Sequence, residues 1–179
     1  MVPVEIIKKY YQEGTELYET LLEHSFLVTD KALYLAQLHP ELNLDIKFIY
    51  EAAMLHDIGI FLTNAEDIHC YGEYPYICHG YLGSELLKKE GFPHHALVCE
   101  RHTGTGLSLE IINKENIPVP KRNMLPETLE EQLICFTDKF FSKKHPENEK
   151  SIDKIRKGLS KHGEDSVLKF DNWCRLFLG

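Results

Sequence analysis

The chain has 179 residues, a formal net charge of −8 and 43% hydrophobic residues. These values indicate a globular chain long enough to bury one core, and they argue against a general nucleic-acid surface, which needs clustered Lys and Arg. No segment approaches the roughly 20 apolar residues that a membrane span requires, so we expect no membrane partner. The N-terminus lacks a secretory signal pattern, and five cysteines without a CxxC pair favour a reduced, cytoplasmic protein.

Hydrophobic periodicity predicts helices along nearly the whole chain. We therefore expect an all-α protein, a single-domain bundle of about seven to nine helices that spans residues 1–179. Asp45 suits the N-cap of the third helix, Gly59 suits the end of that helix, and Pro93 suits the start of the fifth. The expected helices cover residues 4–13, 15–38, 45–57, 78–90, 93–101, 108–116, 126–144, 151–162 and 164–177.

The segment between the third and fourth helices has no clear structure of its own. Residues 60–77, with the sequence IFLTNAEDIHCYGEYPYI, show no helical period and contain several turn residues. We expect a long loop here, and a loop of this length is more often functional than incidental. The chain shows no pair of segments with a hairpin signal, so no β-sheet is expected.

Polar side chains that can bind metal fall on interior faces or at the ends of the expected helices. His24 lies on the apolar stripe of the second helix, and Asp138, in the apolar run ICFTDKFF, would be a buried unpaired charge unless a cation meets it. The stretch EAAMLHDIGIFLTN (51–64) ends an apolar helix with His56 and Asp57, which fit either a metal site or a cap beside a core histidine. Helical bundles build metal sites from side chains that converge in the core. Six candidate ligands on five helices favour such a site: His24, His56, Asp57, His79, His102 and Asp138.

The order of these residues resembles the HD-domain superfamily of metal-dependent phosphohydrolases. The similarity rests on His24, the HDIG string at His56 and Asp57, and Asp138, and it extends from about residue 20 to 142. The segments HGYLGSELL at residue 79 and RHTGTG at residue 102 are similar to the extra ligand positions of the subgroup that binds two metals. The resemblance implies an HD-type bundle with two metal sites. The first site would use His24, His56, Asp57 and Asp138, and the second His79 and His102, with Asp57 bridging both.

The resemblance also implies an activity. We expect a metal-dependent phosphohydrolase, either a phosphomonoesterase or a phosphodiesterase, that acts on a small phosphate ester through a hydroxide bridging the two ions. A nucleotide is the favoured substrate. Imidazole and carboxylate ligands suit divalent transition-metal ions, Fe or Mn first, with Co, Ni and Zn also compatible. Two alternatives stay open: a di-iron oxygenase of the same fold and a non-catalytic metal-binding sensor. The sequence also leaves the oligomeric state open, with a homodimer among the options.

The cationic residues near the ligands differ from the common pattern of the superfamily. Many relatives carry a lysine directly after HDIG, where this chain has Ile60. Arg101, beside His102, and Lys139, beside Asp138, are then the nearest candidates for a catalytic contact to phosphate, together with the catalytic carboxylate of Asp57. The other basic residues of the C-terminal third are expected on a solvated helix face: Lys143, Lys144, Lys150, Lys154, Arg156, Lys157 and Lys161.

The remaining expectations concern loop residues and the other histidines. Because residues 60–77 connect Asp57 to His79, we expect this loop to form a wall or lid of the pocket. Its residues His69, Tyr71 and Tyr74 are the candidates to face substrate. His94 and His95 are alternatives to His102 as ligands, whereas three further histidines should be exposed at helix ends: His39, His145 and His162.

Overall fold

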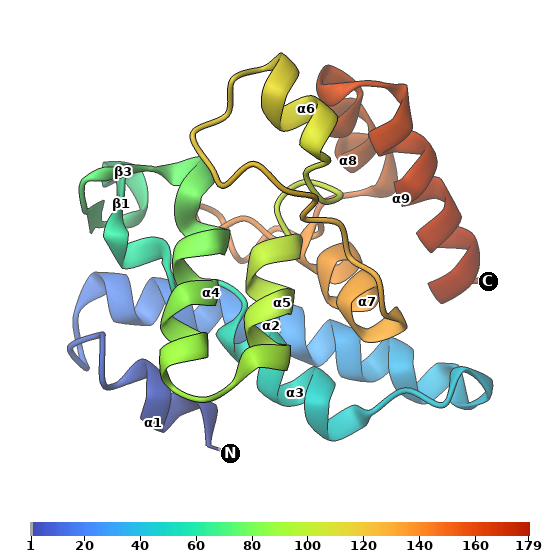
Figure 1. The fold of residues 1–179 in the computed structure, drawn as a ribbon. Helices are drawn as coiled ribbons and strands as arrows, with labels where there is room; N and C mark the ends of the chain where they lie inside the picture. Colours follow the sequence, from blue (N-terminus) through green and yellow to red (C-terminus); the bar gives the residue numbers. More distant parts are fainter. Residues whose placement is uncertain (1) are drawn as a thin grey trace.

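The computed structural model describes residues 2–179, and within them the protein is almost entirely helical (Figure 1). The helices are α1 (Pro3–Ile7), α2 (Glu16–Leu38), α3 (Ile46–Leu55), α4 (His79–Lys89), α5 (Pro93–Arg101), α6 (Leu109–Lys114), α7 (Leu129–Asp138), α8 (Ile152–Leu159) and α9 (Glu164–Phe177). The predicted all-α class, with seven to nine helices, is therefore confirmed for this part of the chain. None of these helices combines the length and apolar character that a bilayer crossing requires.

Several helices begin where the sequence supplies a capping side chain. The side chains of Thr15, Asp45, Thr128 and Ser151 each accept a hydrogen bond from the backbone N–H three residues later. Such a bond satisfies one of the N–H groups that a helix leaves unpaired at its start. The prediction that Asp45 caps the third helix is confirmed, and Pro93 opens α5 as expected.

Two predicted helices extend six residues past their observed ends. The first ends at Ile7 instead of residue 13, and α7 spans Leu129–Asp138 instead of 126–144. After Asp138 the chain leaves the helix, and the backbone N–H of Lys150 donates to the Phe140 carbonyl at 2.8 Å. Pro146 disfavours helical geometry in the residue before it, which is consistent with an irregular segment between α7 and α8.

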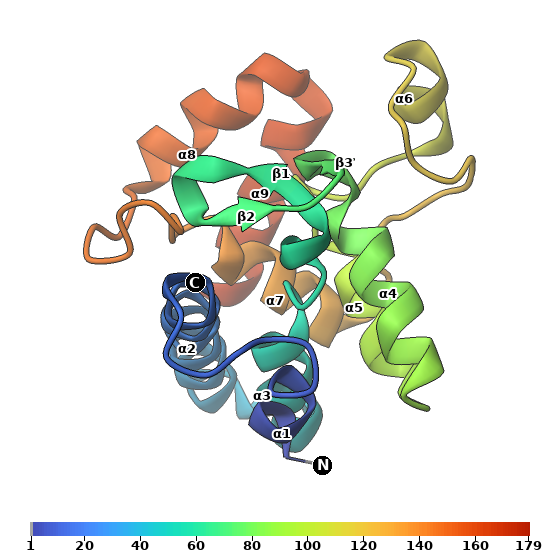
Figure 2. The ribbon, with the colours of Figure 1, turned by 90° about the vertical axis from the view of Figure 1, so that its left-hand side faces the viewer.

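A small sheet replaces part of the loop expected at residues 60–77, so the prediction of no sheet was wrong. Its strands are β1 (Thr63–Ala65), β2 (Cys70–Tyr71) and β3 (Tyr74–Pro75). The order is β2-β1-β3, with β1 antiparallel to β2 and parallel to β3. Strands of two or three residues are too short to show an alternating pattern in the sequence. Figures 1 and 2 place the sheet on one side of the bundle and α9 on the opposite side.

The core has two main hydrophobic clusters, and α2 contributes to both. The larger cluster joins α2, α3, α7, α8 and α9, with the Phe136 and Phe170 rings 5.3 Å apart at its centre. The second joins α1, the start of α2, α4 and α5. On α2, Leu21 belongs to the second cluster and Val28 to the larger one. His24 lies between these two positions, so the candidate ligand is held where the two clusters meet.

Glycines allow the turn after α3 to approach α4 closely. Gly59 has an ordinary φ of −84°, so it does not act as the left-handed helix end that its position suggested. A Cβ atom on Gly59 would instead overlap the His79 carbonyl oxygen and the backbone nitrogen of Gly83. The absence of a side chain at Gly59 therefore lets Asp57 lie beside the first turn of α4.

Candidate metal centre

The structure brings the six predicted ligands together from five helices. His24 lies in the middle of α2, His56 caps the C-terminal end of α3 and Asp57 follows it. The other three are His79, the first residue of α4, His102, which caps the end of α5, and Asp138, the last residue of α7. His56 and Asp57 have no solvent exposure. Burial of so many polar groups in one place indicates a site and not a chance cluster.

The carboxylate of Asp57 lies at the centre of two groups of side chains. In one group are His24, His56, Asp57 and Asp138, and in the other are Asp57, His79 and His102; the ligand atoms within each group lie within 4.8 Å of one another. Oδ2 of Asp57 lies 3.1 Å from His24 Nε2 and 3.0 Å from His56 Nε2. Oδ1 lies 3.3 Å from Nε2 of both His79 and His102. Each oxygen of Asp57 therefore faces one of the two groups.

Backbone carbonyls orient three of the histidines. Nδ1 of His56, His79 and His102 lies 2.6, 2.7 and 2.7 Å, respectively, from the carbonyl oxygen three residues earlier. A carbonyl oxygen can only accept a hydrogen bond, so Nδ1 carries the proton in each ring. Nε2 is then directed at Asp57. Histidines that bind metal are held by the same kind of contact, with one nitrogen bonded to a backbone carbonyl and the other free for the ion.

The free nitrogens and oxygens of the cluster fit metal ions. Nε2 of His79 and Nε2 of His102 lie 3.0 Å apart. Burial lowers the pKa of both rings, that of His79 to about 3, so both are neutral and their lone pairs face each other. Nε2 of His56 lies 3.0 Å from Asp57 Oδ2, and both side chains are completely buried. Such groups are costly to bury unless a cation lies among them, and nitrogen and carboxylate donors suit divalent transition-metal ions.

Lysine and histidine side chains supply positive charge to this cluster. Nζ of Lys143 lies 2.5 Å from Asp57 Oδ2, and Nζ of Lys139 lies 2.7 Å from Asp138 Oδ2. Burial favours the neutral form of both carboxyl groups, but the lysines and histidines outweigh it and hold their pKa values well below the usual range. Burial likewise lowers the pKa of His56, but the carboxylates of Asp57 and Asp138 outweigh this effect and raise it to about 9.

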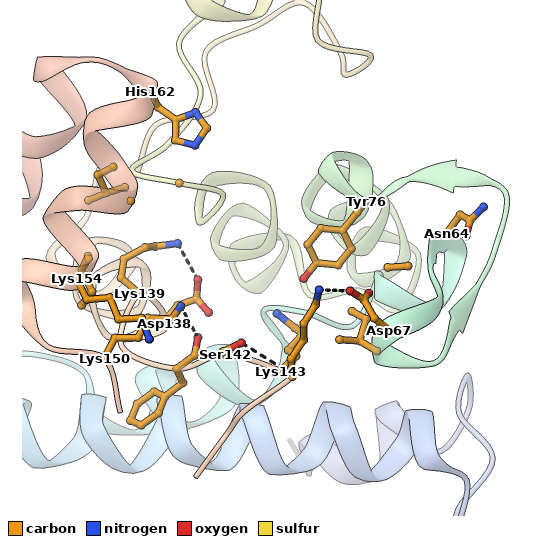
Figure 3. Close-up of a pocket in the computed structure, with 18 residues that line it drawn as sticks. Asn64, Asp67, Tyr76, Asp138, Lys139, Ser142, Lys143, Lys150, Lys154 and His162 are labelled. Atoms are coloured by element: carbon orange, nitrogen blue, oxygen red, sulfur yellow. Dashed lines mark hydrogen bonds and ion pairs between the residues drawn. The ribbon is translucent and has the colours of Figure 1, made fainter. Parts of the chain in front are cut away.

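A cavity of about 820 Å³ opens onto this cluster at Asp138. Its walls are the segment Asn64 to Ile68 with Tyr76 on one side and α8 on the other, as Figure 3 shows. Five lysines line it: Lys139, Lys143, Lys144, Lys150 and Lys154. Lys154 is exposed on α8, as expected for a solvated helix face, whereas Lys143, Lys144 and Lys150 lie outside any helix, so the expectation was wrong for these three. Because α7 ends at Asp138, the chain turns back and directs these side chains toward the cavity. The several lysines that closely follow Asp138 in the sequence were the available signal for a basic cavity wall.

A second, smaller cavity of about 380 Å³ adjoins the first. The two share Gly104, Leu159 and His162 in their linings. The smaller cavity has a mainly apolar wall formed by Ile77, Leu107, Ile111, Ile117 and Pro118. The lysine-lined cavity therefore continues into a space suited to an uncharged group.

Three residues considered in the sequence lie outside the cluster. Arg101 donates two hydrogen bonds to the carboxylate of Glu131, at 3.1 and 2.9 Å, and it does not line the cavity. His94 is exposed on α5. Nε2 of His95 lies 3.2 Å from a carboxylate oxygen of Glu51, and His95 belongs to neither group of candidate ligands. The structure therefore gives Arg101 a structural ion pair and places His102, rather than His94 or His95, beside Asp57.

The segment 60–77 does form a wall of the cavity, but with residues other than those expected. Of the three candidates, His69 forms an ion pair with Glu16 at 3.3 Å, and neither Tyr71 nor Tyr74 lines the cavity. Tyr76 takes that place instead. Its ring stacks on the His79 ring with centroids 4.6 Å apart. Sequence reasoning missed Tyr76, although its position three residues before His79 was a usable signal.

Comparison with known proteins identifies the family. The model of the HD domain family matches residues 21–142, which is most of the chain. The chain belongs to the HD domain family. The predicted resemblance to this superfamily, placed at about residues 20–142, is thereby confirmed.

Two curated relatives share sequence with this family member over much of its length. One, named tRNA (cytidine(56)-2'-O)-methyltransferase from Thermoplasma volcanium, is 26% identical over 171 residues, covering 94% of this chain and 45% of the relative. A protein of the same name from Picrophilus torridus is 30% identical over 125 residues, covering 69% of this chain and 32% of the relative. The chain thus spans less than half the length of these curated relatives, whose names describe the whole proteins.

Solved structures support the fold. The HD domain of the L. monocytogenes phosphodiesterase PgpH superposes with a TM-score of 0.57 at 19% identity, covering 91% of this chain and 84% of that one. The same domain in complex with cyclic-di-AMP gives a TM-score of 0.55 at 17% identity, with the same coverage of both chains. At these identities the likeness shows the HD-type bundle alone.

Proposed function

We propose that this HD-domain protein is a metal-dependent phosphohydrolase that acts on a small phosphate ester, with a nucleotide as the favoured substrate. The observation that carries the proposal is a lysine-lined cavity that opens directly onto a buried cluster of histidines and aspartates. Such a cavity attracts an anion and delivers it to the groups that can hold metal ions. Family membership and the PgpH fold support the same reaction class.

The ligand set proposed from the sequence agrees with the geometry of the cluster. One ion would be held by His24, His56, Asp57 and Asp138, and a second by His79, His102 and the shared Asp57, with Fe or Mn as the best-suited metals. A pair of divalent ions supplies Lewis-acid stabilisation to the attacking and leaving oxygens of a phosphoryl transfer. Three protein ligands at the second site leave room for substrate.

The side chains around the cluster have distinct tasks in this proposal. Lys139 and Lys143 line the cavity beside the carboxylates, so their ammonium groups are placed to neutralise a phosphate. Burial raises the pKa of Tyr76 to about 12, so its phenol stays protonated and can donate a hydrogen bond to a substrate oxygen. Nζ of Lys143 lies 5.8 Å from the centroid of the Tyr76 ring, and both residues line the cavity. Asp57 and Lys139 are retained as catalytic candidates, whereas Arg101 is not.

Two observations support a nucleotide as substrate. The smaller cavity has a mainly apolar wall and adjoins the lysines, as expected for a site that accepts a base next to a phosphate. The PgpH HD domain, which shares the fold, binds cyclic-di-AMP. The names of the curated relatives include tRNA. RNA is therefore among the compounds to test, although the sequence led us to expect no nucleic-acid partner.

The test combines metal analysis with a phosphate-release screen. Protein purified without chelator should carry two transition-metal ions per chain. It should release phosphate from, or cleave, at least one compound among nucleoside mono-, di- and triphosphates, cyclic dinucleotides and short RNAs with terminal phosphates. His102→Ala should lose this activity, whereas His94→Ala, on the exposed side of the same helix, should keep it. Two irons with O₂ consumption and no phosphate release would refute the proposal in favour of an oxygenase.

A further inference from the structure

Two lysines of the cavity have no acidic partner. Lys150 lies just before α8 and Lys154 lies in its first turn, and both line the cavity. Neither has a carboxylate within ion-pair distance among residues 2–179, whereas the three other cavity lysines are each paired with an aspartate. In a chain with a net charge of −8, two unpaired lysines on one cavity wall indicate a place for an external anion.

The backbone fixes both lysines against the cavity. The N–H of Lys150 donates to the Phe140 carbonyl at 2.8 Å, and the N–H of Lys154 donates to the Ser151 hydroxyl at 3.3 Å. Ile155 in the same helix is buried in the larger hydrophobic cluster and holds α8 to the core. Figure 3 shows the two lysine side chains together, across the cavity from the wall that carries Asn64 and Asp67.

The electrostatic surroundings of Lys150 also favour an anion. Burial lowers the pKa of Lys150, and attraction to Asp138 only partly opposes this effect. Repulsion from Lys139, Lys143 and Lys154 lowers it further. An anion bound between these ammonium groups would relieve the repulsion. Lys150 therefore adds positive charge beyond that needed to balance Asp138.

These lysines belong to the part of the chain outside the family match. The match to the HD domain ends at residue 142, and α8 begins at Ile152. The aspartates and histidines of the centre lie inside the match, but Lys150 and Lys154 do not. The cavity is therefore lined both by residues inside the family match and by a wall that lies beyond it.

We propose that Lys150 and Lys154 bind a second phosphate of the substrate, separate from the phosphoryl group that lies at the histidine–aspartate cluster. The inference rests on the proposed function and narrows its substrate class to small nucleotides that carry at least one phosphate beyond the one attacked. The lysines that neighbour the cluster, Lys139 and Lys143, contact the phosphoryl group, whereas the α8 pair contacts the distal one.

The test compares two nucleotides that differ by one phosphate, adenosine 5′-monophosphate and adenosine 3′,5′-bisphosphate. The variants are Lys150→Gln, Lys154→Gln and their combination. The matched control is Lys157→Gln, since Lys157 is exposed on α8 but does not line the cavity. Charge-assisted contacts of this kind suggest a loss of about tenfold in affinity for half-buried Lys150 and about threefold for exposed Lys154. Lys154→Arg, which keeps the charge, should retain binding.

Two readouts separate this inference from the proposed function. In chelator-treated protein, which cannot turn over a metal-dependent substrate, calorimetry should show tighter binding of the bisphosphate than of the monophosphate. The double variant should remove that difference, and Lys157→Gln should not. In metal-loaded protein, the double variant should raise KM for the bisphosphate with kcat nearly unchanged.

Equal losses of affinity for both nucleotides, or no loss, would overturn the distal subsite even if hydrolysis is observed. Selective binding without hydrolysis of either nucleotide would retain the subsite, and the wider phosphate-release screen would then decide the phosphohydrolase.

Discussion

Replacement of Lys143 by methionine tests whether this lysine takes the place of a cation in the metal-free protein. Its ammonium lies 2.5 Å from the buried carboxylate of Asp57, and its side chain is only 11% exposed. Methionine keeps most of the length and the apolar stem but removes the charge. We expect the metal-free variant to be less stable than the wild type, and the metal-bound variant to be as stable as the wild type, because bound ions then balance Asp57.

The size of the effect follows from the burial of the pair. Removal of one partner from a buried ion pair costs about 3–5 kcal/mol, and the lower end applies because His56 remains as a second positive charge beside Asp57. In a protein of this size, about 3 kcal/mol corresponds to a decrease in Tm of about 6–12 °C. Because this loss of stability affects only the metal-free form, Lys143→Met should bind metal about 100-fold more tightly than the wild type.

The assay is thermal unfolding of wild type and Lys143→Met with excess chelator and with Mn²⁺, together with chelator competition for the metal affinity. Lys144→Met is the matched control, because the Lys144 side chain is 54% exposed and its ion pair with Asp67 lies at the surface. That control should change stability by less than about 1 kcal/mol in either condition. An equal decrease in Tm with and without metal would show that Lys143 stabilises the fold independently of the ions.

Three further predictions concern the centre and the core. Asp57→Ala should lose both metal ions in elemental analysis, whereas His102→Ala should keep about one per chain; retention of two ions by Asp57→Ala would remove this residue from the centre. Gly59→Ala should destabilise the protein by about 1–3 kcal/mol in denaturant unfolding and reduce metal content, because a methyl group there pushes α4 away; an unchanged midpoint would contradict the close approach. Phe136→Ala should cost about 3–5 kcal/mol, since this ring is fully buried among the largest cluster, and a loss below 1 kcal/mol would show that the cluster repacks.

Sequence reasoning placed the ligands well because they sit on regular helices. His24 could be assigned to the interior of α2 from steps of three and four residues, and the capped helix that begins after Asp45 carries His56 to a predictable end. The local pattern also placed α5 at its observed bounds, which locates His102. These elements depend on propensities and caps within a few residues, and such signals are readable in a single chain.

The surroundings of the ligands were less predictable because they depend on contacts between distant segments. The strand pairs of residues 63–75 are too short for an alternating pattern, and only tertiary packing directs Tyr76 against His79. The early end of α7 turned Lys143 from an expected solvated face into the cavity. The local sequence gives no clear stop signal at Asp138, so tertiary contacts set the end of this helix.

Three of the imidazoles are anchored at helix ends, which has a kinetic consequence. His56 and His102 follow the last turns of α3 and α5, and His79 opens α4, each held by a carbonyl three residues earlier. The ring orientations are set during folding, so an arriving ion meets donors that need little ordering. Helix ends open locally far more often than the whole domain unfolds. The residence time of an ion would then be governed by the opening of these terminal turns, and the two sites would exchange at different rates if their turns open independently.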